Sequence, residues 1–227
     1  MKKAIVALIT LLLLLSPSSL IAAQDDKQPG VEKPKTKYEV AEKLYKEYNI
    51  TPPSYYVPPA DSYVEMDQKA LDEFERLMRD GYERNKKVKI ENEKKIKALE
   101  ALDGVKQITV PVMIGPNGEI TAGNSEITSD FGILAQKAWK GQGELTYAQL
   151  LAEATVDNSN GYWRFFTNTF RVTGIVQYWP YTYQNTSAWK YTFMDYDETC
   201  AVSFKTDIYL SNSYHDTITE YVEFYAY

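Results

Sequence analysis

Few side chains in this sequence have the types and the spacing that catalysis or metal binding requires. The chain contains one cysteine, Cys200, and one histidine, His215, which could act as a nucleophile and its base. Cys200 alternates with Val202 and Phe204, so we expect it on the buried face of a strand, where a thiol is inert. One thiol and one imidazole form neither an intrachain disulfide nor a zinc site with three or four Cys and His ligands.

Two segments rich in carboxylate and amide oxygens resemble the loops that bind calcium. One contains Asp195, Asp197 and Glu198, and the other is the sequence DNSNG at residues 157–161. The second has its glycine one position early and lacks the glutamate that completes a calcium-binding loop. We therefore expect two solvated turns, and we expect no metal ion or other cofactor.

The composition restricts the class of protein. The 227 residues are 44% hydrophobic and 14% aromatic, which is enough apolar side chain to form a folded core. The formal net charge is -6, and the acidity lies in residues 108–227, where 13 acidic residues face 6 basic ones. Because binding to phosphates requires a concentrated basic surface, we expect no nucleic-acid partner.

Residues 1–23 have the pattern of a secretory signal peptide. Lys2 and Lys3 precede the apolar run 4–15, and the small residues Ala22 and Ala23 precede a charged segment. The apolar run is shorter than the roughly 20 residues of a membrane-spanning helix, although an uncleaved N-terminal anchor is the alternative. We expect a secreted or periplasmic protein with no stable membrane span after cleavage.

The charged segment that follows is expected to be helical. Residues 24–60 form a flexible, proline-rich leader with one short helix, since apolar residues recur at helical spacing before Pro52. Residues 61–104 predict one long, charged helix with a narrow apolar seam, and Gly81 allows a break or kink in it. The seam permits either coiled-coil pairing or packing back on the C-terminal half.

Residues 105–227 predict an antiparallel β domain. Alternation over 108–114, a Gly-Pro-Asn-Gly turn and a short second strand predict a hairpin, with Pro111 at a sheet edge. Aromatic and β-branched runs then predict strands at 162–167, 169–179, 189–195, 200–205 and 217–227. Two short helices are expected before them, at 131–139 and, from the capping-box pattern of Thr146 and Gln149, at 146–154.

Part of this domain is similar to OB-fold domains. The similarity lies in the helix expected at 146–154 and in four strands, RVTGIVQ, YTFMD, CAVSF and TEYVEFY, and it spans residues 146–225. Gly174 would let the first of these strands bend sharply, as a small barrel requires. The resemblance implies a β-barrel, and a β-sandwich with the same alternation is the alternative. The fold class is therefore α+β, a charged helical region followed by an antiparallel β-barrel or β-sandwich.

Period-two alternation assigns the strand residues to two faces. The inward set is Phe170, Val172, Gly174, Val176, Tyr191, Phe193, Cys200, Val202, Phe204, Val222 and Phe224. The outward set mixes aromatic rings with the few cations of this half, a combination that suits stacking on a sugar ring or gripping an extended peptide. Our candidate ligand-binding residues are Arg171, Trp179, Lys190, Lys205, Tyr221 and Tyr225.

These features favour an exported, non-enzymatic binding protein that uses a Tyr- and Trp-rich β surface. A peptide, a glycan or an envelope protein would be its partner. One alternative is a secreted hydrolase that works through carboxylates in the acidic half, although nothing in the sequence marks a pair of them. A second alternative is a self-assembling or toxin-like structural protein whose β edges pair between chains.

Overall fold

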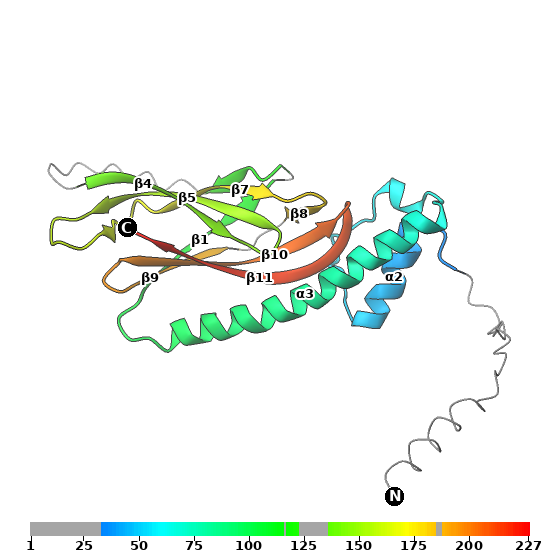
Figure 1. The fold of residues 1–227 in the computed structure, drawn as a ribbon, viewed down its shortest axis with the longest axis horizontal. Coiled ribbons are helices and arrows are strands. Elements are labelled where there is room, and N and C mark those ends of the chain that lie inside the picture. Colours follow the sequence, from blue (N-terminus) through cyan, green and yellow to red (C-terminus); the bar gives the residue numbers. More distant parts are fainter. Residues whose placement is uncertain (1–32, 116, 123–135, 185–187) are drawn as a thin grey trace, which may run out of the picture. The chain divides into compact units, whose positions relative to one another are not determined.

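Helices come first along this chain and strands follow them (Figure 1). The computed structural model describes residues 33–115, 117–122, 136–184 and 188–227, and residues from Pro34 onward form one unit. The helices precede two antiparallel sheets, so the α+β class is confirmed. Within the described part of the chain, no helix is long and apolar enough to cross a membrane.

The predicted short helix is α2, Lys37–Tyr48. Thr36 caps its start by accepting a hydrogen bond from the amide of Glu39, and Asn49 ends it in the left-handed conformation. Its buried side has apolar residues at the predicted spacing, among them Ala41 and Leu44. A short 3-10 helix, η1 (Ala60–Tyr63), then leads to α3.

The predicted long helix is α3, Gln68–Glu100, which starts where the Asp67 carboxylate accepts from the amide of Ala70. It passes through Gly81 as one continuous helix. The apolar seam is confirmed in its first half, where Leu71, Phe74 and Met78 are buried against α2 and the tip of the β10–β11 hairpin (β10, Thr199–Leu210; β11, Ser213–Tyr225).

The strands form two sheets and a ribbon, all antiparallel. One sheet has the order β1-β9-β10-β11, with β8 paired to β10; the remaining bounds are β1 Lys106–Val110, β8 Tyr181–Gln184 and β9 Trp189–Met194. The second sheet has the order β4-β5-β6, with β7 paired to β5; the bounds are β4 Gln136–Glu144, β5 Ala148–Asp157, β6 Arg164–Phe165 and β7 Arg171–Gln177.

The predicted hairpin is the ribbon of β2 (Val112–Ile114) and β3 (Ile120–Ala122). Pro111 separates β2 from β1, and β1 ends its sheet, as the proline indicates. The described strands thus form a sandwich-like pair of sheets and no closed barrel, so the sandwich alternative is correct.

Aromatic side chains fill the space between the two sheets. Phe170 contacts the rings of Trp139, Phe193 and Phe224, which come from both sheets. The close approach depends on glycine in β4, because a Cβ on Gly143 would overlap Val222. These contacts make one continuous core between the sheets.

The burial pattern confirms most of the predicted inward set, and two positions in β7, Gly174 and Val176, depart from it. Val172 and Phe204 are buried as predicted, but Val176 is 46% exposed and Ile175 is buried in its place. The cause is a register shift, since Leu151 pairs with Gly174 whereas Ala152 pairs with Val172. The extra residue in β7 reverses the alternation after it.

Both helices predicted after residue 105 are contradicted where the structure describes them. Residues 146–154 lie mostly in β5, the central strand of its sheet, and residues 136–139 begin β4; residues 131–135 lie outside the described residues. The burial of β5 has period two, so pairing with β4 and β7 outweighs the capping pattern. Thr146 instead donates a hydrogen bond to Glu220 on β11.

The second half of α3 runs along β11, the last strand of its sheet, through polar contacts (Figure 1). The Asn85 side chain donates to Asp216 at 3.3 Å, and the Lys89 ammonium donates to the same carboxylate at 2.8 Å. One turn further on, Asn92 donates to the main-chain oxygen of Thr219 at 2.7 Å. The helix therefore packs back on the C-terminal half and covers an edge strand.

Gly81 is the point at which α3 comes closest to His215. The imidazole is fully buried, and a Cβ on Gly81 would overlap its Nε2 atom. The Tyr82 ring lies edge-on to the imidazole, with 4.4 Å between the two ring centroids. Neither ring nitrogen has a hydrogen-bond partner among the described residues, and burial, with a further contribution from Lys89, lowers the pKa of His215 to about 3.

Replacing Gly81 by alanine tests this close approach. In an open helix interior, the change stabilises by about 1 kcal/mol. Here we expect Gly81→Ala to lower the free energy of unfolding by about 1–3 kcal/mol, because the new methyl group overlaps the imidazole. Urea denaturation measures the change, and in a His215→Ala background the loss should disappear. A Gly81→Ala protein more stable than the wild type would contradict the packing.

The buried imidazole also predicts a pH dependence. The pKa of His215 is about 3 in the folded protein and about 6.5 in the unfolded chain, so the unfolded state binds the extra proton between these values. The stability associated with the neutral imidazole is present above pH 6.5, and it falls by about 1.4 kcal/mol per pH unit between pH 6 and 4. Denaturation curves should show a shallower pH dependence for His215→Leu. Equal slopes for the two proteins would count against a neutral, buried imidazole.

Candidate functional site

Four of the six predicted ligand-binding residues lie on the sheet that contains β9, β10 and β11. Lys190 and Lys205 are exposed, as predicted. Tyr221 is only 7% exposed, so its predicted outward display is wrong: Lys95 of α3 lies over its ring, and its hydroxyl donates to a carboxylate on the same strand. Tyr225 is 42% exposed and its ring lies beside that of Tyr227.

The other two predicted residues lie elsewhere. Arg171 begins β7 in the second sheet, and Trp179 is 91% exposed in the turn between β7 and β8. The structure therefore divides the predicted set between two sheets and a turn. The six residues do not form one surface, and of them only Arg171 lines a cavity described below.

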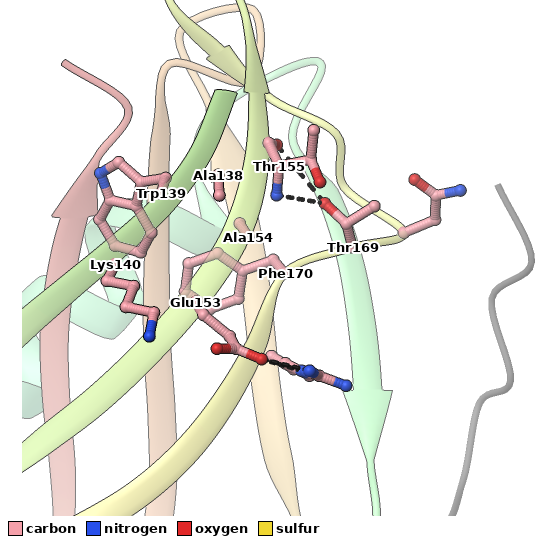
Figure 2. A pocket seen from close by; sticks show the side chains of 10 residues that line it. Ala138, Trp139, Lys140, Glu153, Ala154, Thr155, Thr169 and Phe170 are labelled. Carbon is pink, nitrogen blue, oxygen red and sulfur yellow. Dashed lines mark hydrogen bonds and ion pairs between the residues drawn. The ribbon is translucent and has the colours of Figure 1, made fainter. Parts of the chain in front are cut away.

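Two adjoining cavities of about 370 and 380 Å³ lie along β4, β5 and β7, and the first also reaches the core residues Ala154 and Phe170; we call the two cavities the outer-sheet groove. Lys140 and Glu153 line both cavities. Figure 2 shows the first cavity, with the Trp139 and Phe170 rings on one side and the Thr155–Thr169 hydrogen bond on another. The residues that complete the lining are Ala138, Gly141, Gln142, Leu151, Ala152, Ala154, Asn168, Arg171 and Thr173.

Three charged residues form a row across the groove. Strand register places Lys140 opposite Glu153, and Glu153 opposite Arg171. The Arg171 Nε atom donates to the Glu153 carboxylate at 2.6 Å, and the arginine side chain stays 73% exposed. The row has two cations and one anion, so it is locally positive in the acidic half of the chain. Its polar groups project where a ligand can reach them.

Sequence reasoning identified Arg171 but missed Lys140 and Glu153. Lys140 follows one segment interpreted as a helix, and Glu153 lay inside another. The row of Lys140, Glu153 and Arg171 cannot be predicted from helices, because it forms only when β4, β5 and β7 pair in register. The alternation of small and apolar residues from Ala148 to Val156 is the signal that could have found it.

Two residues of types that can take part in catalysis, Cys200 and Glu220, are buried. Cys200 is fully buried and burial raises its pKa well above the usual value, so its predicted place on the buried face of a strand is confirmed. It pairs with Phe224, at the opposite end of the β10–β11 hairpin from His215. The nucleophile and base hypothesis is therefore wrong.

Glu220 is the other enclosed group. It is 2% exposed, and burial raises its pKa although three donated hydrogen bonds oppose the shift. The Tyr183 hydroxyl donates at 2.5 Å, and the amide and hydroxyl of Thr146 each donate at 3.0 Å. These bonds tie the start of β5 to β11, which is a structural role.

The two acidic segments are turns, as predicted. Asp195–Glu198 joins β9 to β10, and the other segment joins β5 to β6. Hydrogen bonds from Ser159, together with those from Arg164, hold the pKa of Asp157 below its usual value. In the described ranges, no three His, Cys, Asp or Glu residues are placed to hold a metal ion.

Comparisons with known protein families, with curated proteins and with solved structures give no match for this chain. The similarity of its strand sequences to OB-fold domains stays a prediction about sequence, without a matching structure to support it. The residues that can carry a function are therefore those that the geometry brings together, and the outer-sheet groove is the first of these sites.

Proposed function

We propose that this is an exported, non-enzymatic binding protein whose outer-sheet groove holds a polar peptide or glycan. The observation that carries the proposal is the row of Lys140, Glu153 and Arg171, of which Lys140 and Glu153 line both adjoining cavities and Arg171 lines the first. Export depends on the signal-peptide pattern of residues 1–23, which lie outside the described residues.

The groove is shallow and its lining is mixed, which suits an extended ligand better than a small enclosed molecule. Arginine and lysine recognise carboxylates, arginine through two parallel hydrogen bonds. The Gln142 amide and the Thr173 hydroxyl can exchange hydrogen bonds with ligand hydroxyl or amide groups. A glycan or peptide that carries carboxylate groups fits this combination.

The positions of α2 and α3 also support ligand binding at the outer-sheet groove. Helix α3 packs along β11, and α2 packs on α3 (Figure 1). On the other sheet, Lys140, Gln142 and Thr173 remain exposed. A ligand can therefore reach the outer-sheet groove without displacing a helix.

Replacing the two cations of the row by alanine tests the proposal. We expect the wild-type protein to bind at least one acidic glycan or acidic peptide in an array. The double variant Lys140→Ala with Arg171→Ala should weaken that binding about tenfold or more, because two charge-assisted contacts are lost. Titration calorimetry on the ligand found in the array measures the change.

The matched control is Lys190→Ala with Lys205→Ala, which removes two exposed cations from the other sheet. This control should keep the wild-type affinity, and both variants should keep the wild-type melting temperature. The proposal fails if the wild type binds no glycan and no peptide, or if the control loses affinity while the groove variant keeps it.

A further inference from the structure

Two turns that are far apart in the sequence meet beside the C-terminal end of the chain. The amide of Phe165 on β6 donates to the main-chain oxygen of Asp197 in the β9–β10 turn at 2.8 Å. The amide of Ala226 donates to the main-chain oxygen of Glu198 at 2.9 Å. The β9–β10 turn is thus fixed by β6 on one side and by the C-terminal segment on the other.

A cavity of about 520 Å³ lies where these turns meet, and we call it the two-turn cavity. It is lined by Asn160, Tyr162, Arg164, Tyr196 and Glu198. The tyrosines are 70% and 93% exposed, and among the described residues their rings contact neither each other nor another ring. Two aromatic faces therefore stand open beside a cavity.

The turn enforces the display of Tyr196. Asp195, Tyr196 and Asp197 have φ values of 51°, 58° and 70°. Non-glycine residues adopt this left-handed region infrequently, and such a conformation persists only where the surrounding structure holds it. A bulky side chain kept in this conformation and left exposed makes little contribution to the core.

The charged residues that line the cavity are one cation, Arg164, and one anion, Glu198. The Arg164 guanidinium forms an ion pair with the buried Asp157 carboxylate, with 3.0 Å between Nη2 and Oδ2. The Glu198 side chain makes no hydrogen bond or ion pair to a described residue, and Asp195 and Asp197 lie in the same turn. Residues 191–204 contain no lysine or arginine. The carboxylate beside the two rings is therefore available to a cationic ligand.

We propose that the two-turn cavity binds a quaternary ammonium group. Aromatic faces attract such a cation through their quadrupole, and a nearby carboxylate supplies the opposite charge. The group has no N–H bonds, so it needs no hydrogen-bond acceptors, and ring faces offer none. A choline group or a trimethylated lysine side chain would present the same chemistry. This site is separate from the outer-sheet groove and rests on different residues.

A charged probe and its neutral analogue test the proposal. Purified full-length protein is titrated with choline chloride and with 3,3-dimethyl-1-butanol, which has the same shape without the charge. We expect saturable binding of choline and binding of the neutral alcohol that is about tenfold weaker or absent. Chemical-shift changes should centre on Tyr162, Tyr196 and Glu198.

Variants separate the contribution of the rings from that of the fold. Tyr162→Ala and Tyr196→Ala should each weaken choline binding about fivefold to thirtyfold, whereas Tyr196→Phe should keep it, because a phenyl ring retains the quadrupole. Glu198→Gln should also weaken binding. Trp179→Ala is the matched control, since it removes an equally exposed ring from another turn, and it should leave the affinity unchanged.

The proposal is overturned if choline shows no saturation up to about 100 mM, or if the neutral alcohol binds as tightly as choline. Equal affinity of Tyr196→Ala and the wild type would also overturn it. Phosphatidylcholine vesicles and a trimethyl-lysine peptide then identify the source of the group. Binding to vesicles supports a headgroup ligand, binding to the peptide supports a modified protein, and binding to free choline alone supports a small molecule.

Discussion

The polar contact between α3 and β11 is the constraint on which the rest of the structure depends. Asn85, Lys89 and Asn92 follow one another at intervals of three or four residues, so they lie on one face of the helix. They bind a carboxylate and a main-chain oxygen of the strand that ends its sheet. An uncovered edge strand of this length would be a template for pairing with other chains, and the helix occupies that place.

This arrangement leaves the second sheet and the turns at its end available for ligands. The core between the sheets is held by aromatic contacts around Phe170 and by the glycines of β4, which come from the inward side of the second sheet. The charged row of the outer-sheet groove and the two displayed tyrosines differ in character. The first suits carboxylates and hydroxyl groups, and the second suits an organic cation.

Parts of the fold can be predicted from the sequence because helical spacing and strand alternation are local patterns of residues. Helical spacing predicts α2 and the first half of α3, and alternation predicts the burial of Val172 and Phe204. The rest depends on contacts between distant segments. The side of α3 that contacts β11 consists of asparagine and lysine, so a search for apolar residues at helical spacing does not find it. The bulge that exposes Val176 and the pairing that places Lys140 beside Glu153 exist only in the assembled sheet.

Hydrogen exchange along β11 tests the central contact most directly. In the wild type, the amides of β11 should exchange as slowly as those of β10, because α3 protects the edge. In a protein with Asn85→Ala and Asn92→Ala, we expect faster exchange in β11 and α3, while β5 and β7 keep their protection. Unchanged exchange in β11 would show that the polar seam does not hold the helix on the strand, and would contradict this account.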